Sequence, residues 1–147
     1  ARLAVAGFSL GLVELVASVS SSRQTDKWGK ERSIALGALL VIPGGIFLCL
    51  GSNNLIIGLI GVFIYFLGFE FSVVSLLSLA TSLVPNSPGT GLGWVLGAGT
   101  LGRAVMAIIA THLFESFGVQ GPALMGAVFG LLGAVTITTY RRVNANN

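Results

Sequence analysis

Apolar residues in this sequence come in long runs, and polar residues are confined to short stretches between those runs. A helix that crosses the hydrocarbon core of a bilayer needs about 20 mostly apolar residues. Five runs reach that length, and none alternates between apolar and polar residues as the strands of a membrane barrel do. The pattern therefore predicts an all-α integral membrane fold with five transmembrane helices, at about residues 3–22, 34–51, 55–83, 91–114 and 122–140.

Basic residues gather in some links between the predicted helices and are missing from others. The longest link, residues 23–33, holds four of them: Arg23, Lys27, Lys30 and Arg32. Lys and Arg concentrate on the cytoplasmic side of membranes, so this link is expected to be a cytoplasmic loop. Counting spans onward then places residues 52–54 and 115–121, which hold no Lys or Arg, outside the cell. The C-terminus, with Arg141 and Arg142, falls in the cytoplasm.

The composition agrees with a membrane protein. Of 147 residues, 54% are hydrophobic and 9% are charged, whereas soluble domains carry about 25% charged residues. The net charge of +3 comes without a basic face interleaved with aromatic residues, so the expected partner is the lipid bilayer and not a nucleic acid. The single cysteine, Cys49, allows no internal disulfide and no paired-cysteine site. No cofactor and no metal are expected.

The stretch GAGTLG, residues 97–102, has the glycine spacing of a dinucleotide-binding turn. Such a turn needs a preceding strand and an acidic residue about 20 positions later, but the nearest downstream acid is Glu115. Small residues on one helix face let a neighbouring backbone approach closely in lipid. A helix-packing face is therefore expected at Gly93, Gly97, Gly99 and Gly102, with similar pairs at Gly126 and Gly130 and at Gly7 and Gly11.

The second predicted span is interrupted near its middle by Pro43-Gly44-Gly45. Proline removes a backbone hydrogen bond from a helix and kinks it. A break is expected there, and two interpretations stay open: a bend used in gating, or the ordinary presence of Pro and Gly in membrane helices.

Three charged residues lie inside the predicted spans. Arg103 is about 12 residues, or roughly 18 Å, from the cytoplasmic end of its span, and Glu70 is about 13 residues, or roughly 20 Å, from that end of the preceding one. A central Arg is unfavourable by about 2.5–3.5 kcal/mol on insertion scales, so the two are expected to pair directly or through water. Glu14, in the first span, either faces the bundle interior or joins a rim of serines.

The pair has two open interpretations. It fixes helix register and does nothing else, or Glu70, Arg103 and Glu14 lie on a substrate or proton pathway. In the second case a carboxylate in the membrane binds a proton and releases it as water access changes.

The first link also carries a motif, TDKWGKERSI, at residues 25–34. Four residues in it match the Asp-Arg-x-Gly-Arg core of the loop motif of the major facilitator superfamily, which the chain resembles: Asp26, Lys27, Gly29 and Lys30. Glu31 stands where a second basic residue is usual, and Arg32 supplies that charge one position later. In this family the loop is a cytoplasmic latch, in which Gly29 would permit a tight reversal and Asp26 would approach a helix N-terminus.

The resemblance implies a fold and a function. Residues 68–85 and 87–118 are similar to helices ten and eleven of bacterial drug-efflux-type members. The chain would then be helices eight to twelve of twelve, a partial C-terminal six-helix bundle whose partner is the missing N-terminal half. The implied function is alternating-access transport, as proton-coupled export of small organic molecules across the bacterial inner membrane.

Two other classes of function are weighed against transport. One is a non-transporting membrane scaffold or accessory subunit, in which Glu70 and Arg103 form a purely structural pair. The other is an integral membrane enzyme, which needs converging nucleophile, base or metal ligands. One His, one Cys and scattered acids do not supply them, so no enzyme is expected.

Overall fold

The computed structural model describes the backbone of residues 2–145, and the side chains in that range apart from those of residues 2–6, 9, 10 and 145. Every regular element in the described part is helical, which confirms the predicted all-helical class there. The elements are α1 Arg2–Trp28, α2 Lys30–Leu50, the short 3-10 turn η1 Gly51–Asn53, α3 Leu55–Leu83, α4 Pro88–Phe117 and α5 Gln120–Ala145.

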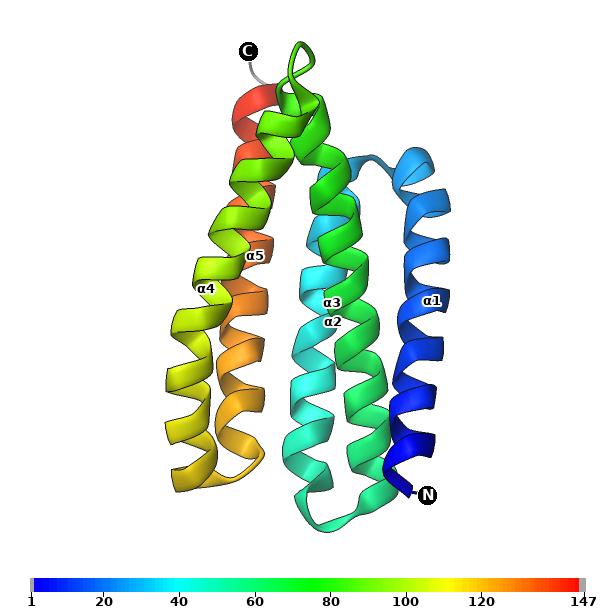
Figure 1. Ribbon diagram of the computed structural model, residues 1–147, viewed down its shortest axis with the longest axis vertical. Coiled ribbons are helices and arrows are strands. Elements are labelled where there is room, and N and C mark those ends of the chain that lie inside the picture. Colours follow the sequence, from blue (N-terminus) through cyan, green and yellow to red (C-terminus); the bar gives the residue numbers. More distant parts are fainter. Residues whose placement is uncertain (1, 146–147) are drawn as a thin grey trace.

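The five long helices alternate in direction (Figure 1). The α1–α2 junction, the turn between α3 and α4 and the end of α5 lie at one end of the bundle, drawn at the top. We call this the basic end, because it carries six of the eight Lys and Arg residues: Arg23, Lys27, Lys30, Arg32, Arg141 and Arg142. The link between α2 and α3 and the link between α4 and α5 lie at the opposite end.

The helix bounds agree closely with the sequence-based prediction for α3 and differ most at the first link. Residues 23–33 were expected to form a loop, but α1 continues to Trp28 and α2 begins at Lys30. Only Gly29 interrupts the helices, with a φ of 87° that side chains with a Cβ rarely adopt. The tight reversal expected at Gly29 is confirmed, and the rest of the link is helical because Arg, Gln, Lys and Glu are good helix formers.

The N-termini of α3 and α4 are stabilised in different ways. The Asn54 side chain caps α3 by accepting hydrogen bonds from the backbone N–H groups of Ile56 at 3.0 Å and Ile57 at 3.3 Å. Pro88 was expected to belong to the preceding turn, but it lies in the first turn of α4. Proline is tolerated there because the first N–H groups of a helix have no partner within the helix.

The most extensive contact between helices joins α2 to α3. Glycines line it from both sides: Gly37 and Gly44 on α2, and Gly61 and Gly68 on α3. A Cβ added at any of them would lie 2.5–2.7 Å from a backbone atom of the other helix. Hence this contact depends on backbones approaching closely, as small residues permit in membrane helices.

The break expected at Pro43 is absent, because α2 runs through it from Lys30 to Leu50. The two glycines after it serve packing: Gly44 faces Tyr65 of α3, and Gly45 faces Ala123 of α5.

On α5, Gly130 lies against the Ala38 carbonyl and Gly126 against the Tyr65 ring. The small-residue face predicted at Gly126 and Gly130 is thus confirmed, whereas a Cβ added at Gly7 or Gly11 would meet nothing within 4 Å in the described structure.

The outer surface is suited to lipid. Helices α2 to α5 are each long and apolar enough to cross a membrane. Large apolar side chains remain exposed along their length, among them Leu55, Leu101 and Ile108. Because contiguous apolar surface of this extent is unfavourable in water, the chain is an integral membrane protein.

Candidate functional site

The three charged residues predicted within the spans each lie close to the middle of a helix. Glu14 is on α1, Glu70 on α3 and Arg103 on α4. Glu70 is half-buried, whereas Glu14 and Arg103 are exposed. The three residues therefore lie away from the helix ends, and no ion pair joins them among the described residues.

The expected direct ion pair between Glu70 and Arg103 is not formed among the described residues. The reason is the course of α4, which starts against α3, where Gly91 meets the Ala80 carbonyl. From there α4 moves away from α3 and runs beside α5 (Figure 1). Glu70 instead lies on the helix against which α1, the helix that carries Glu14, packs.

A seam of buried hydroxyl groups joins α1 to α3 on the side of these carboxylates toward the basic end. Thr25 and Ser75 share a hydrogen bond of 2.8 Å between their hydroxyl oxygens, and Ser21 lies 3.3 Å from Ser75. Ser21 also donates to the Phe71 carbonyl at 3.2 Å. All three hydroxyl residues are buried. Because few partners are available in an apolar surrounding, these bonds fix how α1 sits on α3.

Ser75 is the centre of this seam, and its replacement with alanine is expected to destabilise the protein by about 1–3 kcal/mol. The change removes both bonds made by the Ser75 hydroxyl and leaves the buried Thr25 hydroxyl without the partner it has in the structure. The measurement is the free energy of unfolding in mixed detergent micelles.

Ser22→Ala is the matched control for Ser75→Ala. Ser22 is exposed and its hydroxyl donates only to the Val19 carbonyl of its own helix. The control is expected to change stability by less than about 0.5 kcal/mol. Equal stabilities for the two variants would show that the seam does not hold α1 in place.

The motif residues surround the α1–α2 junction at the basic end. Gly29 is the N-cap of α2 and makes no side-chain cap hydrogen bond, and the approach of Asp26 to that N-terminus stays a prediction. Glu31 lies in the first turn of α2 and provides the negative charge favoured there. Lys30 Nζ donates to the Ser78 carbonyl of α3 at 3.0 Å. Thus the junction is tied to α3 by Lys30, while Lys27 and Arg32 are exposed.

The glycines of α4 do not pack against another helix within the described residues. A Cβ added at any of four positions would meet nothing within 4 Å: Gly93, Gly97, Gly99 and Gly102. The close packing predicted for this face is therefore not made by the described chain, because α4 lies at the edge of the bundle (Figure 1).

At the end of α4 away from the basic end, His112 Nδ1 lies 3.7 Å from Glu115 Oε2. Both side chains are exposed, as expected for residues at a membrane interface. Within residues 2–145, no three His, Cys, Asp or Glu side chains gather as metal ligands would.

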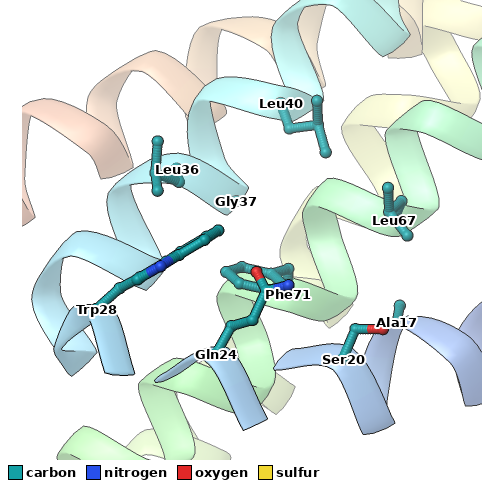
Figure 2. A pocket seen from close by; sticks show the side chains of 9 residues that line it. All are labelled: Ala17, Ser20, Gln24, Trp28, Leu36, Gly37, Leu40, Leu67 and Phe71. Carbon is teal, nitrogen blue, oxygen red and sulfur yellow. The ribbon is translucent and has the colours of Figure 1, made fainter. Parts of the chain in front are cut away.

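A groove of about 420 Å³ opens between α1, α2 and α3 (Figure 2). The rings of Trp28 and Phe71 face each other across it, with centroids 6.3 Å apart and planes tilted by 47°. Its lining is mostly apolar and includes Gln24, Trp28, Leu36, Leu40, Leu67 and Phe71. No pattern in the sequence pointed to this groove, because it forms from three helices that are brought together only by folding.

The sequence profile of the Major Facilitator Superfamily matches residues 1–146. No curated protein and no solved structure matches the chain.

Proposed function

The chain belongs to the Major Facilitator Superfamily, whose members are transporters, and we propose that it forms the last five of the twelve helices of a proton-coupled exporter. Five helices of alternating direction and the Asp-Lys-x-Gly-Lys junction between α1 and α2 support this numbering. The proposed location is the bacterial inner membrane, with the basic end and the C-terminus in the cytoplasm. Placement of six basic residues at one end supports that orientation.

The observation that carries the proposal is the pair of carboxylates at the α1–α3 contact. Glu14 lies near the middle of α1 and Glu70 near the middle of α3, and these two helices are in contact. Two neighbouring carboxylates repel when both are charged, and one bound proton relieves that repulsion. Together they form a site that exchanges a proton when water reaches it, first from one side of the membrane and then from the other.

Arg103 and the glycine face of α4 complete the proposed polar centre. Both are exposed in the described structure, and an exposed Arg at mid-membrane depth is unfavourable unless it meets water or an acceptor. We place this face toward the N-terminal half of the transporter, with the small organic substrate bound between the halves. Arg103 then contributes a positive charge to the substrate cavity.

The proposed latch is the α1–α2 junction with Asp26, Lys27, Gly29, Lys30 and Arg32. The bond from Lys30 to the Ser78 carbonyl ties this junction to α3, which carries Glu70. Movement at the cytoplasmic side would therefore be passed to the helix that holds the proton site. The scaffold alternative has less support, because its structural pair between Glu70 and Arg103 is not formed among the described residues.

The experiment is a flux assay on the complete transporter in proteoliposomes with a pH-sensitive dye inside. A panel of small organic solutes is added under an imposed pH gradient. The expected result is proton movement that depends on one class of solute and disappears with a protonophore. Solute movement that ignores the pH gradient would refute proton coupling, and no solute-dependent movement would favour the scaffold.

A further inference from the structure

The groove between α1, α2 and α3 lies apart from the proposed proton site and has a lipid-like character. Its volume of about 420 Å³ is in the range of ligand pockets, about 300–1,000 Å³. Leu36, Leu40 and Leu67 line it, and Trp28 and Phe71 flank it toward the basic end (Figure 2). It remains open because α1 packs on α3 far more than on α2.

Helical spacing places two basic residues, Lys27 and Arg32, where this groove meets the basic end. Arg32 is one and two helical turns before Leu36 and Leu40, so it shares their row on α2. Lys27 follows Gln24 by three positions and therefore flanks the groove side of α1. Both are exposed, and neither forms an ion pair in the part of the chain that the structure describes.

The acidic residues nearby point elsewhere. Asp26 is two positions from Gln24 and two from Trp28, which puts it on the opposite side of α1. Glu31 is five positions before Leu36 and nine before Leu40, which puts it on the far side of α2. The end of the groove thus has a net positive charge next to an apolar interior, and polar Gln24 and Ser20 lie between the two.

We propose that this groove binds an anionic phospholipid, with an acyl chain along the leucines and the headgroup phosphate at Lys27 and Arg32. An acyl chain matches the apolar lining, and the charge at the open end is complementary to a phosphate. The Trp28 indole lies at the boundary, where tryptophan is favoured in membranes. The inference needs the chain to be in a bilayer but does not depend on transport, so it goes beyond the proposed function.

The lipid would stabilise the arrangement of α1 and α2, which make few contacts with each other. It would fill the space between α1 and α2 and contact both sides of the Gly29 junction. The same groove could instead accept a hydrophobic substrate, but a substrate site would not require two cations at its membrane-surface end. Charge complementarity therefore favours the anionic lipid.

The test uses Trp28 as the reporter, in the complete transporter with every other tryptophan, including Trp94, replaced by phenylalanine. The protein is reconstituted in vesicles containing brominated phosphatidylglycerol or brominated phosphatidylcholine with the same acyl chains. Bromine quenches tryptophan fluorescence on contact, so competition between the lipids gives their relative affinity for the groove. We expect a preference of about tenfold for phosphatidylglycerol, given the attraction that each basic residue adds.

The double variant K27Q/R32Q is expected to reduce this preference to less than about twofold. The matched control R141Q/R142Q removes two exposed basic residues at the same end of the bundle, on α5, and should keep the preference. Equal quenching by the two lipids, or an unchanged preference in K27Q/R32Q, would overturn the proposal. Release of both lipids by the lipophilic cation tetraphenylphosphonium, with no preference between them, would assign the groove to substrate and would also overturn it.

Discussion

Replacing Glu70 with glutamine is expected to lower proton-driven transport by about a hundredfold or more, the contribution of a side chain that transfers a proton. Glutamine keeps the shape of the side chain and its hydrogen-bonding capacity, but it cannot take up or release a proton. Glu70 is half-buried in the middle of α3, and α1, which carries Glu14, packs on α3. Removing its charge therefore ends proton exchange between water and the proposed Glu14–Glu70 site, while the packing of α3 stays as it is.

The measurement is solute flux in proteoliposomes under an imposed pH gradient, scaled to the amount of transporter in the membrane. Glu115→Gln is the matched control, since Glu115 is an exposed glutamate at the end of α4, with its Oε2 3.7 Å from His112 Nδ1. It should retain flux within about twofold. Normal pH-driven flux in Glu70→Gln would remove Glu70 from the proton pathway, and equal losses in both variants would indicate a general loss of folding.

Part of this site was visible in the sequence, and part required the fold. Glu14, Glu70 and Arg103 stand out because charges are unfavourable inside apolar spans, and all three do lie near the middle of helices. Their partners could not be read from depth alone. Equal depth and a short turn favoured Glu70 with Arg103, but α4 leaves α3 after the turn (Figure 1), and α1, which carries Glu14, packs on α3.

The helices themselves were largely predictable, because about 20 consecutive apolar residues have few other stable arrangements in a membrane. The predicted and observed bounds of α3 are the same, Leu55–Leu83. The first link was harder, since a run of polar residues fits a loop and also fits the exposed ends of two helices. Only Gly29, with its positive φ, had to lie outside a helix.

The hydroxyl seam shows a second limit of sequence patterns. Ser21 and Thr25 are four positions apart on α1, a spacing that places them on one face, but serines near a helix end are equally typical of an interface. Their role became clear only once α3 placed Ser75 between them. Glycine was similarly ambiguous, because the densest glycine pattern lies on α4 whereas the close packing is between α2 and α3.

The glycines of the α2–α3 contact are expected to be sensitive to substitution. Gly68→Ala is expected to destabilise the protein by about 2–3 kcal/mol, as overpacking does. Its Cβ would lie 2.7 Å from the Gly37 carbonyl oxygen and 2.9 Å from the Val41 backbone nitrogen. Both neighbours are backbone atoms, so no side-chain rotation relieves the overlap, and α2 and α3 must move apart. Because α2–α3 is the largest helix contact, the shift of α3 also moves the side chains that it carries, including Glu70.

Gly133→Ala is the matched control in the interior of α5. Its Cβ would lie 3.9 Å from the Ala38 Cβ, an ordinary contact, and alanine favours a helix by about 0.5–1 kcal/mol over glycine. The two variants should thus change the free energy of unfolding in mixed micelles in opposite directions. If Gly68→Ala were as stable as Gly133→Ala, the close approach of α2 to α3 would not be what holds the bundle together, and the larger contribution would have to come from the apolar side chains around it.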